Sequence, residues 1–270
     1  MPINPVRPTR LKALATLVCG LDYPSYFDEW EKLVLTNDRL LVVASRDHGK
    51  SSFFAKLYVL YELVMRPGIE VLLISYAENQ VIKLITGIKD WIECKEGLGT
   101  LKPTGDEDWS RTALKLRNGS KLESGTFGSA MRGGHFDLIV VDDPVRDERG
   151  PEPEMQLDYF NRAIVPMVKP TGKMIVCGNF VYEMDLIESL EKNPAYNVAI
   201  YPAINAKGQA LWPERWPIEL LEKRRLEIGE YAFAKEYLLQ KISLGTQFFK
   251  RSMFQYYNEH EIPDRLYRLL

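Results

Sequence analysis

The sequence has few cysteines, no long apolar run and no excess of charge of either sign. Its 3 cysteines, Cys19, Cys94 and Cys177, lie far apart, which argues against a disulfide scaffold or a zinc site and fits a reducing compartment. The longest apolar runs, such as 138–141, are far too short to cross a bilayer. Residues 1–10 lack the apolar segment of a signal peptide, so we expect neither secretion nor a membrane partner.

The charge balance excludes one large class of proteins. Lysine and arginine together number 35 and aspartate and glutamate 37, which gives a formal net charge of -2. Such a chain is no polycation, although a local basic face for nucleic acid remains open. Its 270 residues are 46% hydrophobic and 27% charged, a globular balance that excludes disordered and fibrous classes.

Apolar runs of strand length alternate with segments of helical spacing. The predicted strands are 40–44, 71–75, 138–141 and 174–177, the predicted helices are 50–65, 79–93, 154–165, 218–228 and 231–239, and 114–117 with 121–124 forms a hairpin. This alternation predicts an α/β fold, with a mostly parallel central sheet flanked by helices. We expect a core with an N-terminal arm over 1–205. Tryptophan, proline and charge then become frequent, which predicts a helical lid or linker region over 206–270.

Residues 44–51 (ASRDHGKS) match the spacing of a P-loop, with Ala44 at the position of the first glycine. They follow a predicted buried strand and open a predicted helix, as this motif requires. Backbone N–H groups would hold phosphates, Lys50 would neutralise them and the Ser51 hydroxyl would bind Mg²⁺. A chance match in a loop is the alternative. We predict ATP and Mg²⁺ as cofactors and a nucleotide held by Ser45, Arg46, Asp47, His48, Gly49, Lys50, Ser51 and Ser52.

A second motif, residues 138–143 (LIVVDD), is an apolar strand that ends in two aspartates. This is the Walker B pattern, in which Asp142 would hold Mg²⁺ and Asp143 would orient and deprotonate the attacking water. Strands also end in aspartate for turn geometry alone. Many ATPases of this class have glutamate at the second position, and aspartate is one methylene shorter.

Three loops carry further candidate residues. Arg46 within the P-loop is either a solvated cation or a catalytic group that senses the γ-phosphate or the catalytic carboxylate. Asp47 would repel phosphate, so we expect it to point away or to pair with a cation, and His48 is interpreted as a loop filler. An exposed arginine near the nucleotide can act on a neighbouring subunit. Arg146 is our first candidate for this role, with Arg132 of the glycine-rich segment 125–134 and Arg149 as alternatives to it.

The strand 174–177 is followed by a small residue and an amide. Cys177, Gly178 and Asn179 can sense the γ-phosphate and couple hydrolysis to the C-terminal helices, or can form a simple turn. Basic residues alternate through the predicted hairpin and flank a later turn, either as a solvated face or as a DNA contact. They are Arg111, Lys115, Arg117, Lys121, Lys169 and Lys173.

With these motifs the chain resembles the ATPase domain of the large terminase subunit of tailed double-stranded DNA bacteriophages. Four segments are similar to that family: the P-loop that carries Arg46, Asp137 to Pro144 after Arg132 and Gly133, Cys177 to Asn179, and Leu211 to Arg215 with the later stretch 233–240. The family usually has Gly-Thr at its coupling motif, and Asn179 departs from that.

The resemblance implies a P-loop NTPase fold of the ASCE type with a helical lid subdomain. It implies ATP-driven translocation of double-stranded viral DNA into the procapsid, in the host cell cytoplasm at the portal. The implied partners are DNA, the portal protein and the small terminase subunit, with a homo-oligomeric ring on the capsid and a monomer in solution. The family's nuclease domain is expected beyond residue 270, so no DNA cleavage is expected from this chain.

Two other functions stay open at this point. A helicase-type DNA translocase needs a second RecA-like domain, for which 270 residues leave little room. A nucleotide-binding regulatory or structural module with weak hydrolysis is compatible with aspartate at position 143.

Overall fold

A computed structural model describes residues 11–94, 97–105, 108–129, 133–145, 153–181 and 184–241. Its centre is a 7-stranded sheet in the order β3-β4-β2-β5-β6-β1-β7. The strands are β1 (Arg39–Ala44), β2 (Glu70–Ser75), β3 (Ala113–Lys115), β4 (Lys121–Thr126), β5 (Phe136–Asp142), β6 (Val168–Gly178) and β7 (Asn197–Tyr201). Only β3 is antiparallel to its neighbour, so the predicted mostly parallel sheet is confirmed.

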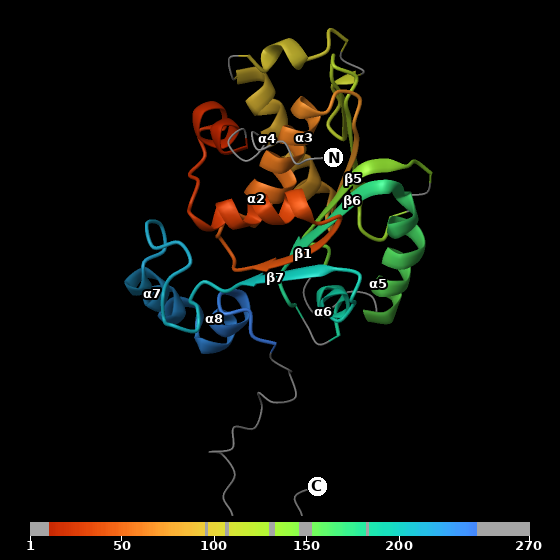
Figure 1. Cartoon of the computed structure of the whole chain (residues 1–270). Helices are drawn as coiled ribbons and strands as arrows, with labels where there is room; N and C mark the ends of the chain where they lie inside the picture. The colour runs from red at the N-terminus through yellow and green to blue at the C-terminus, as the bar shows by residue number, and fades with distance from the viewer. Residues whose placement is uncertain are drawn as a thin grey trace, which may run out of the picture.

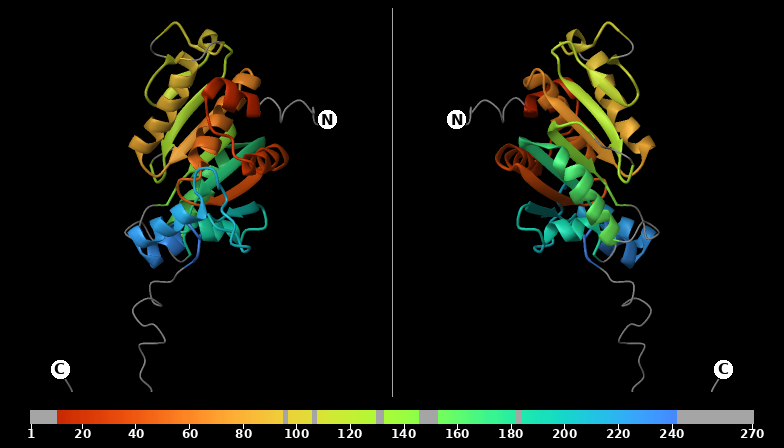
Figure 2. Two further views of the ribbon diagram at one scale, coloured as in Figure 1. Left: turned by 90° about the vertical axis from the view of Figure 1, so that its left-hand side faces the viewer. Right: turned by 90° about the vertical axis from the view of Figure 1, so that its right-hand side faces the viewer.

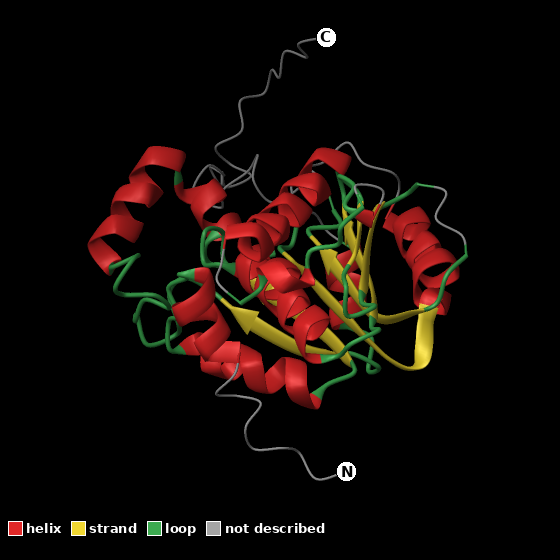
Figure 3. Ribbon diagram, turned by 90° about the horizontal axis from the view of Figure 1, so that it is seen from above, coloured by secondary structure: helices red, strands yellow, loops and turns green. Residues whose placement is uncertain are grey.

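The helices form the outer layers of the fold. They are η1 (Leu14–Cys19), α2 (Tyr26–Thr36), η2 (Ser52–Leu57), α3 (Tyr58–Met65), α4 (Glu78–Cys94), η3 (Gly99–Leu101), α5 (Pro153–Tyr159), η5 (Phe160–Ile164), η6 (Val165–Met167), α6 (Leu186–Glu191), α7 (Ile218–Ile228) and α8 (Glu230–Glu236). In Figures 1 and 3, helices flank the strands on both sides, with α2, α3 and α4 opposite α5 and α6. This is the predicted α/β fold class.

The alternation of side chains along β1 explains why both faces need helices. Leu40, Val42 and Ala44 belong to the apolar cluster under α2, α3 and α4, whereas Leu41 and Val43 belong to the cluster under η5 and α6. All of these side chains are buried. A strand that is apolar on both faces has a continuous apolar sequence, which is why this strand was predictable.

The C-terminal helices lie at one end of the molecule, away from α4 and the β3–β4 hairpin (Figure 2). Trp212 and Trp216 precede α7, and Phe233 and Tyr237 lie in or just after α8; all four side chains are buried in the cluster that also contains α2. This region is therefore packed against the sheet domain. The boundary at residue 205 stays a prediction, and residues 242–270 lie outside the described residues.

Local predictions agree with the structure where the apolar pattern was strong. All predicted strands and helices are present, with β6 longer and α8 shorter than expected. The elements η1, α2, α6 and β7 were not predicted. β7 has a half-exposed edge pattern instead of a buried run, so its sequence lacks a clear strand signal. Within the described residues, no helix combines the length and apolarity that a membrane crossing requires.

Candidate nucleotide site

The P-loop connects the end of β1 to the helix that begins at Lys50. Gly49 has φ +82°, in the left-handed region that favours glycine. A Cβ at this position would also lie 2.9 Å from the Phe27 ring, so this turn needs glycine for two reasons. The Ser45 N–H donates to the Tyr201 carbonyl of β7 at 3.0 Å, which fixes the start of the loop to the edge strand.

The two aspartates lie beside this loop because β6 separates β5 from β1 and keeps all three carboxyl ends in register. Asp142 is paired with Cys177, and Cys177 with Val42. The Asp143 N–H donates to the Cys177 carbonyl at 2.8 Å. Asp143 itself has φ +46°, an uncommon conformation for a residue other than glycine that turns the chain away from the sheet.

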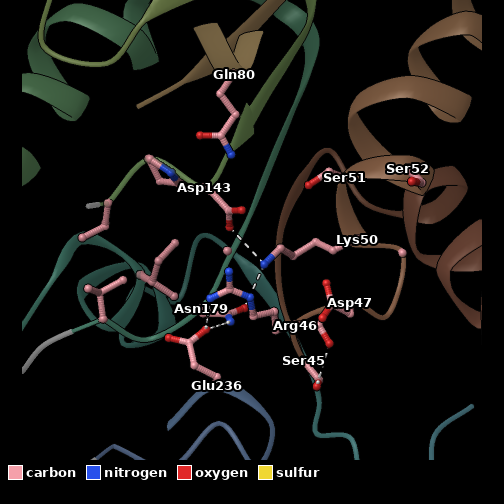
Figure 4. Close-up of a pocket in the computed structure, with 16 residues that line it drawn as sticks. Ser45, Arg46, Asp47, Lys50, Ser51, Ser52, Gln80, Asp143, Asn179 and Glu236 are labelled. Atoms are coloured by element: carbon pink, nitrogen blue, oxygen red, sulfur yellow. Dashed lines mark hydrogen bonds and ion pairs between the residues drawn. The ribbon is translucent and has the colours of Figure 1, made fainter. Parts of the chain in front are cut away.

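Lys50 is the central cation of the site. Its Nζ lies 3.0 Å from Asp143 Oδ1 and donates to Asn179 Oδ1 at 2.8 Å (Figure 4). Burial alone would lower the pKa of this ammonium, but the charges of Asp143 and Asp142 outweigh burial and raise the pKa above its ordinary value. Lys50 is therefore held charged in a buried position.

Asp142 is fully buried and only partly satisfied. Its Oδ1 accepts hydrogen bonds from Ser51 Oγ at 3.0 Å and Cys177 Sγ at 3.2 Å. Its Oδ2 has no hydrogen-bond partner among the described residues. Burial, followed by the charge of Asp143, raises the pKa of this carboxyl to about 7. Such an oxygen is suited to a cation ligand, since an ion would satisfy it.

These residues surround a cavity of about 550 Å³. Its lining includes most of the predicted site: Ser45, Arg46, Asp47, Gly49, Lys50, Ser51, Ser52, Asp143, Gly178 and Asn179. Gln80 near the start of α4 and Glu236 at the end of α8 also line it, and Figure 4 shows Gln80 directed towards Asp143. Neither residue was predicted, because neither lies in a motif and only the folded chain brings them to the site.

Asp47 and His48 face the C-terminal region. Asp47 has φ +61°, and its Oδ2 accepts a hydrogen bond from the Tyr237 hydroxyl at 3.4 Å. Its carbonyl accepts from Trp216 Nε1 at 3.2 Å. The buried His48 ring stacks on Trp216 with centroids 6.1 Å apart and is not part of the cavity lining. Asp47 has neutral partners, not the cation that was considered.

Gly178 leaves room between β6 and α6. A Cβ there would lie 3.1 Å from Ile187 Cδ1 and 3.6 Å from Asp143 Oδ1, so a larger residue would crowd both. Asn179 follows and contacts two elements at once: its Oδ1 accepts from Lys50, and its Nδ2 donates to Glu236 Oε2 at 3.3 Å. The predicted coupling segment therefore joins the P-loop lysine to the last residue of α8.

The remaining candidates are of two kinds. Arg132, Arg146 and Arg149 lie outside the described residues. Several lysines considered for DNA are instead engaged within the fold. Lys121 pairs with Glu70 at 2.9 Å, and Lys169 lies 2.9 Å from both Glu70 and Asp137. These pairs reduce the positive charge that the hairpin side of the molecule presents.

Comparisons with known proteins give consistent relatives. No protein-family model matches the chain. The chain is 24% identical over 242 residues to the large terminase subunit of Enterobacteria phage T3, which covers 75% of this chain and 41% of that protein. The chain thus spans less than half the length of this curated relative.

Solved structures with the same fold are also large terminases. The ATPase domain from Thermus phage P74-26 has a TM-score of 0.62 at 16% identity, covering 84% of this chain and 97% of that chain. The HK97 bacteriophage large terminase has a TM-score of 0.63 at 14% identity, covering 87% and 55%. A large terminase from a thermophilic bacteriophage, in complex with ATP-gamma-S, has a TM-score of 0.51 at 10% identity, covering 78% and 49%.

The sequence match and the structural matches agree, and the resemblance seen in the motifs is confirmed. This chain has the P-loop NTPase-like fold of the ATPase domain of phage large terminases and is similar in sequence to a large terminase subunit.

Proposed function

We propose that this chain is the motor domain of a phage large terminase, which hydrolyses ATP to move double-stranded DNA into the procapsid. One observation carries the proposal: Lys50 and Ser51 of the P-loop lie against Asp142 and Asp143 of β5, around one cavity. A cation, a hydroxyl and two carboxylates at adjacent strand ends are the groups that phosphoryl transfer to water requires.

The nucleotide phosphates would lie along the P-loop. Its backbone N–H groups and the N-terminus of the following helix point towards an anion placed there. Lys50 would exchange its Asp143 partner for the β and γ phosphates. The ATP-gamma-S complex of the thermophilic phage terminase supports this, because that protein has the same fold.

Asp142 and Ser51 fit a Mg²⁺ ion. The buried Asp142 Oδ2 without a partner and the adjacent Ser51 hydroxyl supply two oxygens, and this ion commonly combines one or two protein oxygens with phosphate oxygens and waters. Bound there, the ion would neutralise charge that develops on the phosphates. Asp142 would then be ionised, since a cation favours the carboxylate.

Asp143 would act on the water. Once Lys50 turns to the phosphates, the Asp143 carboxylate is free to accept a proton from a water in the cavity. Gln80 is directed towards Asp143 in Figure 4 and can hold the same water with its amide. Arg46 would contribute charge beside the γ-phosphate. An arginine from a neighbouring subunit, with Arg146 as first candidate, would complete the site.

The wider assembly follows from the terminase assignment. We propose a homo-oligomeric ring on the portal in the host cytoplasm, a small terminase subunit as partner, and a monomer in solution. DNA contact would come from few basic residues per subunit, because the net charge is -2 and several lysines are paired internally. We also propose that nuclease activity belongs to a domain beyond residue 270.

A second candidate, a nucleotide-binding module with weak hydrolysis, is favoured by the short Asp143 side chain and its contact with Lys50. Phosphate release from Mg-ATP, measured with and without double-stranded DNA at low and high salt, separates the two. A motor should be stimulated by DNA, and the stimulation should fall steeply with salt. Nucleotide binding with no DNA-stimulated turnover would instead favour the module.

A further inference from the structure

Glu236, the last residue of α8, contacts the P-loop and the end of β6 together. Its main-chain carbonyl accepts a hydrogen bond from the Arg46 N–H at 3.1 Å. Its Oε2 lies 3.8 Å from Arg46 Nη1 and accepts from Asn179 Nδ2 at 3.3 Å. Figure 4 shows this carboxylate directed into the cavity, towards both partners.

The contacts continue to the centre of the site. Asn179 uses its other amide atom to accept from Lys50 Nζ at 2.8 Å, and Lys50 lies 3.0 Å from Asp143. The carboxylate of α8 is thus connected through one amide to the ammonium that would bind phosphate. A movement of Lys50 or Asn179 towards a nucleotide is therefore felt at the end of α8.

Arg46 has a choice between two anions. Its side chain is 64% exposed and lines the cavity, so it is free to rotate from Glu236 to a phosphate group. A guanidinium suits either partner, since its planar donors match carboxylate and phosphate oxygens. The same arginine cannot pair fully with both when one of them lies deeper in the cavity.

We propose that Glu236 is a positioning residue that competes with the nucleotide triphosphate for Arg46, so that nucleotide binding releases the side-chain tie between α8 and the P-loop. This inference rests on the proposed nucleotide site. Glu236 holds Arg46 and Asn179 in the nucleotide-free state, and a γ-phosphate takes over Arg46. The backbone hydrogen bond between the two segments remains as a hinge.

The strength of the tie suits a reversible switch. An exposed pair with nitrogen and oxygen 3.8 Å apart contributes little, and its loss changes an equilibrium about two- to fivefold. Competition of this size lets a nucleotide shift the pairing without locking it. Binding that favours one of two states by such a factor shifts their populations by the same factor.

The test is a double-mutant cycle on nucleotide affinity. The affinity of Mg-ATP-gamma-S is measured for wild type, Glu236→Gln, Arg46→Ala and the double variant, with Glu230→Gln on the same helix as matched control. Glutamine keeps an acceptor for Asn179 and removes the charge that holds Arg46. We expect Glu236→Gln to bind two- to fivefold more tightly than wild type, no gain in the Arg46→Ala background, and no change in the control.

Hydrogen exchange gives a second readout that a structural role would not move. In wild type, Mg-ATP-gamma-S should speed exchange at the amides of α8, whereas in Glu236→Gln exchange there should be fast with or without nucleotide. Weaker binding by Glu236→Gln, or an equal gain in the Arg46→Ala background, would overturn the competition. Absence of binding by wild type and the Glu230→Gln control would instead overturn the nucleotide site itself.

Discussion

The ammonium of Lys50 lies 3.0 Å from the Asp143 carboxylate, so the groups proposed to bind phosphate and to activate water are paired with each other. The pair satisfies two charges that would otherwise be buried or half-buried without a partner. It also keeps Asp143 occupied until a phosphate draws Lys50 away. Nucleotide binding and activation of Asp143 are therefore linked through one side chain.

Replacing Asp143 with asparagine should separate binding from hydrolysis. Asparagine tolerates the left-handed backbone at this position, where φ is +46°, so the fold should be kept. The amide cannot accept the proton of the attacking water. We expect phosphate release to fall by about 100-fold or more, while affinity for Mg-ATP is kept or increased because Lys50 loses a competing anion. Turnover close to wild type would exclude Asp143 as the base.

Gly49 is predicted to be essential for the P-loop on packing grounds as well as backbone grounds. Gly49→Ala introduces strain at φ +82° and places a methyl group 2.9 Å from Phe27. Gly68→Ala is the matched control, because Gly68 has φ +80° with nothing within 4 Å of the added Cβ. Strained backbone of this kind costs about 1–3 kcal/mol.

Urea unfolding followed by tryptophan fluorescence measures both variants. Gly49→Ala should lose more stability than Gly68→Ala, and Phe27→Leu should recover part of the difference by making room. Equal losses in the two alanine variants would mean that the contact with Phe27 adds nothing.

The acid–base behaviour of Glu31 on α2 gives a prediction for stability against pH. Burial raises the pKa of this carboxyl to about 7, and the hydrogen bond from the Tyr23 hydroxyl, 2.8 Å from Oε2, offsets burial only in part. The folded state thus favours the protonated acid. Its contribution to stability is fully present below the unfolded pKa and is lost as pH rises through about 7.

Glu31→Gln should therefore stabilise the protein at pH 8 by on the order of 1 kcal/mol relative to wild type, with little difference near pH 4. Glutamine keeps an acceptor for Tyr23. Thermal unfolding at the two pH values measures the effect, with Asp90→Asn, an exposed carboxylate on α4, as control. A difference between Glu31→Gln and wild type that does not depend on pH would contradict the raised pKa.

The parts of this site that were predictable are those encoded locally. The P-loop and the two aspartates follow apolar strands, and strands buried on both faces have an unmistakable sequence. Their meeting point was predictable too, because carboxyl ends of parallel strands lie at one edge of a sheet. Asn179 was placed at that edge by the same reasoning.

Glu236 and Gln80 could not be found in this way. Each lies at the end of a helix whose position depends on how that helix packs, and neither residue type is unusual there. The orientation of Asp47 and His48 is likewise set by Tyr237 and Trp216, which lie far along the chain. Contacts of this kind arise from tertiary packing and leave no periodic or spaced pattern in the sequence.

The central claim is that Lys50 and Asp142 form a working ATPase site. Steady-state release of phosphate from Mg-ATP tests it most directly, compared among wild type, Lys50→Ala, Asp142→Ala and the control Lys83→Ala, whose lysine is exposed on α4. We expect turnover in wild type and Lys83→Ala, and a loss of about 100-fold or more in each of the other two. Unchanged turnover in Lys50→Ala and Asp142→Ala would contradict the account.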